Sequence, residues 1–278
     1  MIKIITDTTA SLTIEEYNRY GICAVPLYVR QGDITKKELY EISYDQFYSD
    51  QRNGIKFTTS QPDPQAFIDT FRPIIENGDE VICITISSHI SGTINSASLA
   101  KDILETEQIS IFDSQQSGFG QAALAIKAAE LAQNGRSRTD ILVILENMRR
   151  NSRIYFVVES LRYLYEGGRL SGAQALFGSL IQIKPIIWFD EIGMMTPIEK
   201  VRTLKAAKSK TLDLIKERIP FGIETAGLHY GDNLEEAIAY QKSMEEIIQK
   251  PVSLIKLSPV IATHTGPDIL GPCIITRN

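Results

Sequence analysis

The sequence predicts an α/β protein of two domains: a three-layer N-terminal domain with a parallel sheet, and a C-terminal α+β domain with a mixed sheet. In the first half, short apolar runs alternate with helical segments, an order typical of a parallel sheet with helices on both faces. In the second half, a predicted hairpin turn at residues 190–193 indicates a mixed sheet. A polar stretch at residues 149–153 separates the halves, so we predict domains at residues 1–151 and 152–278.

The elements of the first domain follow from apolar runs and from apolar residues at helical spacing. Residues 81–86 form a continuous apolar run rich in β-branched side chains, which predicts a strand buried on both faces. Helical spacing from residue 64 stops at Asn77 and Gly78, a typical helix end. In chain order we predict strand 2–5, helix 13–20, strand 25–29, helix 64–76, strand 81–86, helix 93–104, strand 109–112 and helices 120–133 and 139–150.

The second domain is predicted by the same criteria, with Gly167 and Gly168 closing a short helix. No linker rich in Gly, Ser or Pro joins the halves, so we expect the domains to pack closely. In chain order we predict strand 154–158, helices 160–165 and 173–181, strand 185–189, helix 203–218, strand 223–229, helix 234–248 and strands 252–257 and 273–276.

Composition and charge restrict the classes of function. The chain has 278 residues, of which 43% are apolar and 23% charged, as in soluble globular proteins. The net charge of −5 argues against broad nucleic-acid binding, which depends on basic surfaces. No run approaches the ~20 apolar residues of a membrane span. The first residues turn polar too early for a signal peptide, and Cys83 reads as a buried thiol, so we expect a cytoplasmic protein.

Four polar segments rich in Ser and Thr, which we call the hydroxyl clusters, are candidates for anion binding. Hydroxyls can donate to an anion without carrying charge, and ligands of parallel sheets bind beyond the carboxyl ends of the strands. The alternative is that Ser91 or Thr93 only caps the helix that follows. A cap needs one hydroxyl and these segments supply several, which favours a ligand. The clusters are residues 6–11, 58–62, 87–93 and 263–267.

Three further features are candidates for binding. His264 lies between two threonines, and we expect it in an accessible polar loop where it could contact an acid. His229 ends an apolar strand and is expected to be structural. Arg169 follows two glycines and could be a surface charge or a partner contact. A basic cluster could be a solvated helix face or bind a phosphorylated ligand or acidic partner; it comprises Lys200, Arg202, Lys205, Lys208 and Lys210.

Several enzyme classes lack their sequence motifs. The chain has no phosphate-binding G-x-x-x-x-G-K-[ST] loop, no dinucleotide-binding G-x-G-x-x-G and no G-x-S-x-G elbow. The spacing of the histidines matches no metal-binding motif. A hydrolase triad of Ser91, His264 and either Asp7 or Asp113 stays open, because such triads assemble in space.

As a set, these segments resemble the DegV family of bacterial fatty-acid-binding proteins. The resemblance runs from the first predicted strand to the last. Each segment is modestly specific, whereas their order and spacing together are highly specific. The matching segments are residues 6–10, 59–62, 87–93, 167–171, 183–186, 200–202 and 263–267.

The resemblance implies a two-domain α/β fold with one long-chain fatty acid, of the palmitate, stearate or oleate type, buried in a tunnel between the domains. It implies that Thr59 and Ser91 bind the carboxylate and that His264 lies close by. It associates Arg202 with the acyl phosphate, and we assign Arg169 to the acyl phosphate or to a partner. The supporting head-group residues would be Ser60, Gly92, Thr93 and Thr265.

The expected function is therefore lipid binding without catalysis, cofactor or metal, in lipid transport or fatty acid metabolism. The resemblance implies a separate ATP-dependent fatty acid kinase as partner. An acyl chain gains ~0.8 kcal/mol per buried methylene, so the tunnel would supply most of the affinity. The alternative is a small-molecule phosphotransferase or an esterase acting through Ser91 and His264.

Overall fold

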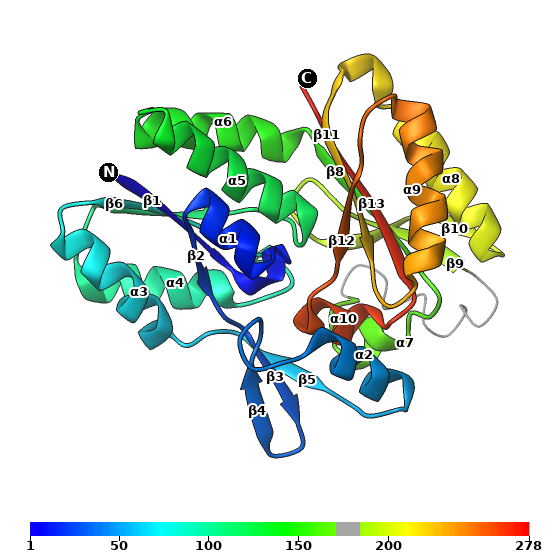
Figure 1. Ribbon diagram of the computed structural model, residues 1–278, viewed down its shortest axis with the longest axis horizontal. Coiled ribbons are helices and arrows are strands. Elements are labelled where there is room, and N and C mark those ends of the chain that lie inside the picture. The colour runs from blue at the N-terminus through cyan, green and yellow to red at the C-terminus, as the bar shows by residue number, and fades with distance from the viewer. Residues whose placement is uncertain (171–183, 278) are drawn as a thin grey trace.

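The computed structural model describes residues 1–170 and 184–277, and its N-terminal sheet has four parallel strands (Figure 1). Helices α3 (Pro64–Glu76) and α4 (Thr93–Leu104) cover one face of this sheet. Helices α1 (Ile14–Tyr20), α5 (Phe119–Gln133) and α6 (Arg138–Arg150) cover the other face. The strand order is β2 (Ile22–Val25), β1 (Ile2–Asp7), β6 (Glu80–Thr85) and β7 (Ile109–Asp113).

The strands of this sheet are buried on both faces. Successive residues of β1 point to opposite sides: Ile4 packs with α5, and Ile5 packs with α3 and α4. The same holds in β6, where Ile82 belongs to the first side and Cys83 to the second. The predicted three-layer arrangement around a parallel sheet is therefore confirmed.

The second sheet is mixed, as predicted, and lies in the C-terminal half. Strands β11 and β12 are parallel, and the other neighbouring strands are antiparallel. Helices α8 (Leu204–Lys216) and α9 (Leu234–Ile248) cover one of its faces. The strand order is β10 (Met195–Val201), β9 (Lys184–Phe189), β8 (Ser152–Val158), β13 (Ile269–Thr276), β11 (Ile223–Tyr230) and β12 (Ser253–Lys256).

Helix α5 joins the two sheets through a shared core. It contacts β1 and β6 of the parallel sheet and β8, β11 and β13 of the mixed sheet. Most of its residues are buried, and many are alanines, whose small side chains let the sheets approach closely. One apolar cluster consequently contains Ile82 and Ile84 from the first sheet together with Ile154 and Cys273 from the second.

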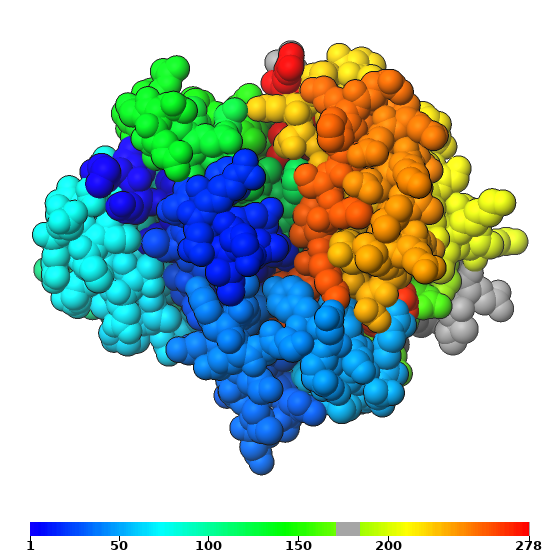
Figure 2. Space-filling model, viewed as in Figure 1, coloured from blue at the N-terminus to red at the C-terminus, as the bar shows by residue number. Residues whose placement is uncertain are grey.

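A third, antiparallel sheet corrects the prediction of a strand at residues 25–29. Strand β2 ends at Val25, and β3 (Tyr28–Gln31) belongs to a different sheet. Pro26 lies between them, and proline cannot donate a hydrogen bond to a strand ladder. In this third sheet β3 lies between β4 (Ile34–Lys37) and β5 (Thr58–Ser60), and the β3–β4 hairpin projects from the molecule (Figure 2).

Helix α10 (Pro259–Thr265) corrects a second prediction, because it places His264 on a helix instead of in an accessible loop. This helix packs against the third sheet and α2 (Tyr44–Arg52), an element that the sequence did not predict. The Tyr48 hydroxyl donates to the Leu257 carbonyl at 2.9 Å, and Gln51 Nε2 donates to the Ala262 carbonyl at 2.8 Å. We call β3, β4, β5, α2 and α10 together the small-sheet module.

The other predicted elements agree with the structure, except that β13 begins four residues before its predicted start. Helices α3, α4 and α9 have the predicted bounds. The predicted hairpin turn joins β9 to β10, and Gly193 in it has a φ of +84°, which favours glycine. The predicted helix at residues 173–181 lies outside the described residues. Among the helices that are described, none has both the length and the apolar composition that crossing a membrane requires.

Candidate functional site

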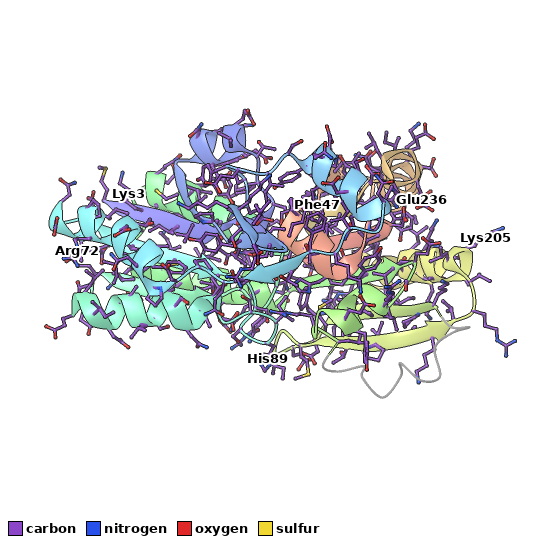
Figure 3. All side chains as sticks on the ribbon, turned by 90° about the horizontal axis from the view of Figure 1, so that it is seen from below. Lys3, Phe47, Arg72, His89, Lys205 and Glu236 are labelled. Atoms are coloured by element: carbon purple, nitrogen blue, oxygen red, sulfur yellow. The ribbon has the colours of Figure 1, made fainter. Side chains whose placement is uncertain are left out.

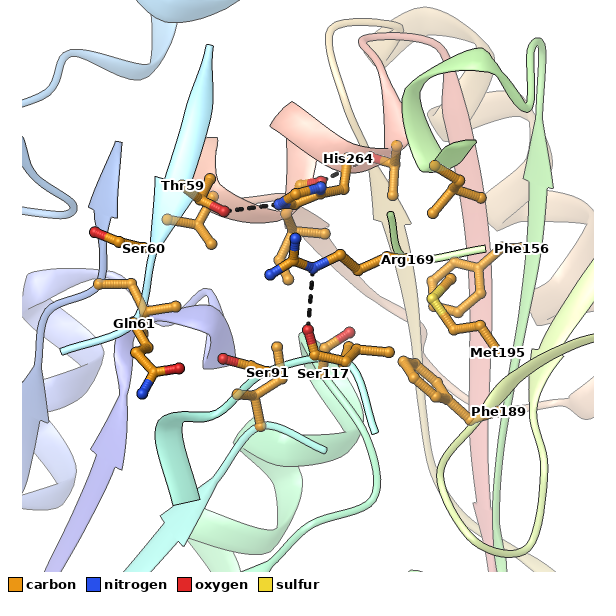
Figure 4. A pocket seen from close by; sticks show the side chains of 17 residues that line it. Thr59, Ser60, Gln61, Ser91, Ser117, Phe156, Arg169, Phe189, Met195 and His264 are labelled. Atoms are coloured by element: carbon orange, nitrogen blue, oxygen red, sulfur yellow. Dashed lines mark hydrogen bonds between the residues drawn. The ribbon is translucent and has the colours of Figure 1, made fainter. Parts of the chain in front are cut away.

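A cavity of about 60 Å³ lies where loops beyond the parallel strands meet the mixed sheet and the small-sheet module. Figure 4 shows Phe156, Phe189 and Met195 on one side of the cavity and Thr59, Ser60, Gln61 and Ser91 on the other. The polar side is formed by Thr59, Ser60, Gln61, Ser91, Ser117, Arg169, His264 and Thr265. The apolar side chains are Leu27, Ile86, Ile90, Phe156, Leu164, Phe189, Met195, Val260 and Ile261.

A hydrogen bond between Thr59 and His264 forms one edge of the polar side. Thr59 Oγ1 lies 2.7 Å from His264 Nε2. The backbone of Thr59 pairs with Val29 of β3, which fixes the direction of the threonine side chain. The site therefore combines the second and fourth hydroxyl clusters, which are far apart in the sequence.

The His264 ring is neutral at pH 7. Burial, and to a lesser extent the positive charge of Arg169, together lower its pKa to about 4. The residue is partly exposed, but its Nδ1 atom is buried and has no hydrogen-bond partner among the described residues. Gly167 packs directly against this atom, since a Cβ built on Gly167 would lie 2.1 Å from it. A larger residue at position 167 would have to displace the ring.

Ser91 reaches the cavity from the loop before α4. Its Oγ lies 2.9 Å from Thr93 Oγ1 and accepts from the Thr93 backbone N–H at 3.3 Å. Gly92 is the N-cap residue of α4 and packs against Gln61, whereas Thr93 is completely buried. Of the predicted head-group residues in this loop, Ser91 lines the cavity, and Gly92 and Thr93 hold the loop in place.

Arg169 brings a positive charge to the cavity. Its Nε donates to the Ile90 carbonyl at 3.2 Å, and its Nη1 donates to the Gly167 carbonyl at 2.7 Å. Within residues 1–170 and 184–277 it forms no ion pair with a carboxylate. Burial lowers the pKa of Arg169 because charge is less stable away from water. Figure 4 shows its guanidinium between the Thr59–His264 pair and Ser91, where it could bind an anion.

Arg202 lies outside this cavity, in an exposed position directly after β10. Two other members of the basic cluster form ion pairs: Lys208 with Glu236, and Lys210 with Glu199 at 3.4 Å. Lys205 projects from one end of the molecule (Figure 3). The cluster therefore forms a partly neutralised surface that is separate from the cavity.

Sequence reasoning did not identify several residues that line the cavity. Gln61 and Ser117 are polar and lie in or near segments already noted, so their residue types gave a weak signal. Phe156 and Phe189 lie in strands, and no local pattern distinguishes a side chain that faces a cavity from one that fills the core. Whether Phe156 and Phe189 line the cavity depends on how the two sheets face each other.

The geometry gives no support to a hydrolase triad. His264 Nε2 bonds to Thr59, and Ser91 Oγ bonds to Thr93. Asp7 accepts from the backbone N–H groups of Thr9 and Ile86, at 3.1 and 2.8 Å. Asp113 accepts from the backbone of the loops beside it. Among the described residues, no three His, Cys, Asp or Glu side chains are grouped so that they could hold a metal ion.

The fold and the cavity define a class of two-sheet α/β proteins that enclose a pocket with one polar and one apolar side. The family model described as "Uncharacterised protein, DegV family" matches residues 1–277. The chain belongs to the DegV family. It is 36% identical over 278 residues to Protein DegV of Bacillus subtilis, covering 98% of both chains.

Solved structures of relatives have the same fold. The structure of DegV from Bacillus subtilis, described as a fatty acid binding protein, matches with a TM-score of 0.90 at 35% identity, over 99% of both chains. A stearic acid-binding protein from Eubacterium ventriosum matches with a TM-score of 0.90 at 27% identity, over 100% of this chain and 99% of that chain. Structural relatives of this chain thus include proteins that bind fatty acids.

Proposed function

We propose that this protein binds one long-chain fatty acid, with the carboxylate on the polar side of the cavity and the acyl chain on the apolar side. The observation that carries the proposal is Arg169, a half-buried cation without an acidic partner among the described residues, in a cavity whose other lining side chains are uncharged. Relatives described as fatty acid binding support the same ligand class. Palmitate, stearate and oleate are the candidate acids.

The head group would be held by neutral donors and one charge. The hydroxyls of Thr59 and Ser91 would donate to the carboxylate, and Arg169 would offset its charge. If His264 Nε2–H donates to Thr59 Oγ1, the threonine proton is free to point at the ligand. In that tautomer the unpartnered His264 Nδ1 carries a lone pair, so no buried N–H group is left without an acceptor. Ser60 and Thr265 line the cavity beside these groups.

The acyl chain would supply most of the binding free energy. Burying a sixteen-carbon chain contributes on the order of 10 kcal/mol before entropic costs. A cavity of about 60 Å³ has room for a few water molecules only, so apolar side chains have to move aside to form a tunnel. Met195 is well suited to this, because an unbranched thioether side chain adapts its shape easily.

We further propose that the bound acid is presented to a separate ATP-dependent fatty acid kinase in the cytoplasm, as part of lipid transport or fatty acid metabolism. The acid would lie between domains formed by residues 1–151 and 152–278. A second cavity, open to the surface, shares Thr59, Arg169 and His264 with the first, which supports access to the head group from outside. Arg202, exposed after β10, would contact the partner or the acyl phosphate.

Denaturing mass spectrometry of protein purified from bacterial cells tests the proposal. We expect about one fatty acid of sixteen to eighteen carbons per chain, because such a ligand with a buried tail dissociates slowly. Added palmitate or oleate should bind to protein from which lipid has been removed. A protein that carries no fatty acid and takes up neither added acid would contradict the proposal.

A further inference from the structure

Glu38 is a buried carboxylate in the turn after β4, with 0% of its surface exposed. Its Oε2 accepts from the Thr8 hydroxyl at 2.5 Å, and its Oε1 accepts from the backbone N–H of Val260 at 2.6 Å. Thr8 Oγ1 also accepts from the Leu27 N–H at 3.1 Å, so the hydroxyl proton of Thr8 points at Glu38. No basic side chain among the described residues pairs with Glu38. Burying a carboxylate costs free energy, so a carboxylate in this position indicates a structural or functional role.

The contacts of Glu38 connect it to the head-group site through α10. Val260 is the second residue of this helix, and His264 is on its last turn. The backbone N–H of Glu38 donates to the Leu27 carbonyl at 2.9 Å, which ties the turn to the chain that leads into β3. The same sheet carries Thr59 on β5. Hydrogen bonds therefore join both ends of α10 to the third sheet and its β4 turn. Glu38 of the turn bonds to the start of the helix, and Thr59 of β5 bonds to His264 at its end.

We propose that Glu38 is a positioning residue of the head-group site, whose ionised carboxylate holds α10 where His264 meets Thr59. Protonation of Glu38 would weaken its bond to the Val260 N–H and loosen the helix. Retention of the bound acid would then depend on pH. The part of this inference that concerns the acid rests on the proposed function, whereas the part that concerns α10 does not.

The surroundings of Glu38 favour titration near neutral pH. Burial raises the pKa of Glu38 to about 7, against the lowering effect of the hydrogen bonds from Thr8 and Val260. Ser258 lies close enough to lower this pKa, although its Oγ makes no hydrogen bond of good geometry among the described residues. The negative charge of Asp7 acts in the raising direction. The other titratable groups that interact with Glu38 are Tyr17, Tyr44 and Tyr48.

The dissociation rate of a labelled fatty acid, measured between pH 6 and pH 8, tests the proposal. We expect dissociation from the unaltered protein to be roughly tenfold faster at pH 6 than at pH 8, the effect of weakening one charge-assisted hydrogen bond. Glu38→Gln should release the acid rapidly at both pH values. Glu41→Gln removes an exposed carboxylate from the same turn and should retain the pH profile. His89→Gln removes an exposed histidine and should likewise retain the pH profile.

Two further measurements separate positioning from a general loss of stability. Thr8→Val removes a donor to the ionised form and should move the midpoint of the pH profile to higher pH. Amide hydrogen exchange of the ligand-free protein should show faster exchange across residues 260–265 in Glu38→Gln than in Glu41→Gln. A Glu38→Gln variant with unaltered exchange in α10 and an unaltered pH profile would overturn the inference. If the unaltered protein binds no fatty acid, the proposed function fails and the exchange measurement still decides the role of Glu38.

Discussion

Thr59 and His264 are 205 positions apart in the chain, yet their side chains share a hydrogen bond. The sequence indicated both residues as contacts of a carboxylate, but neither local segment predicts that they bind each other. Arg169 shows the same limit: sequence reasoning assigned it to the acyl phosphate or to a partner, and the structure places it among the cavity residues. Residue type restricts what a side chain can bind, whereas its neighbours depend on which segments fold together.

At the residue scale, Gly167→Ala should weaken fatty acid binding by about 1 kcal/mol, the typical contribution of one hydrogen bond. The φ of Gly167 is −77°, so the backbone accepts alanine, but the new Cβ would overlap His264 Nδ1 and push the ring away from Thr59. Competition with a fluorescent fatty acid measures the change. Glu166→Ala, at an exposed position on the same turn, is the matched control. Equal affinities for both variants would show that the position of the ring has no effect on binding.

At the element scale, prediction succeeded where one face of an element is apolar or a strand is wholly buried. Helices α3 and α9 have apolar residues at helical spacing, and the sequence predicted their bounds. Helix α10 has seven residues and is buried on nearly all sides, so it lacks an alternation of apolar and polar faces that could be recognised. Strand β5 has three residues and no apolar side chain. His264 and Thr59 therefore lie on α10 and β5, two of the elements that the sequence did not predict.

His229 joins two elements, and its effect on stability should depend on pH. Its Nε2 accepts from the Phe119 N–H at the start of α5, and its Nδ1–H donates to the Gly271 carbonyl in β13. Burial lowers the pKa of His229 to about 4, so the folded protein favours the neutral ring. The contribution of His229 to stability is thus fully present above the unfolded pKa of ~6.5 and is lost as the pH falls toward 4.

Chemical denaturation of the unaltered protein and of His229→Gln checks this prediction. The difference in the free energy of unfolding between them should shrink by about 2 kcal/mol between pH 7 and pH 5, at ~1.4 kcal/mol per pH unit below 6.5. Glu38, whose pKa is raised, changes stability with pH in the opposite direction. Because both proteins contain Glu38, its contribution cancels in the difference between them. His89→Gln controls for the loss of an exposed histidine. A difference that stays constant over this range would show that His229 is not held neutral.

At the scale of the whole molecule, the two large sheets share one apolar core, although they come from different halves of the chain. Helix α5 fills the space between them, and the cluster around it includes side chains of both sheets. The domain boundary near residue 151 stays a prediction, but a division there would expose α5. Unfolding one sheet alone would therefore expose a large apolar surface of the other.

We consequently expect the protein to unfold in a single cooperative transition. Trp188, the only tryptophan of the chain, lies in β9 and reports on the mixed sheet, whereas far-ultraviolet circular dichroism reports on the helices of both halves. The midpoints of thermal unfolding measured by these two signals should coincide. Added palmitate should raise both midpoints by the same amount. A fluorescence transition several degrees away from the dichroism transition would contradict a shared core.

The sequence by itself determined the class of the fold, the bounds of helices α3, α4 and α9, and the chemical character of the candidate binding residues. These follow from local patterns: apolar periodicity, helix ends and segments rich in hydroxyls. Only the tertiary structure decided that Thr59 bonds to His264, that Arg169 lies between them and Ser91, and that Glu38 accepts a hydrogen bond from the first turn of α10. The physical reason is that such contacts join residues far apart in the chain, and their energies depend on burial that no local segment specifies.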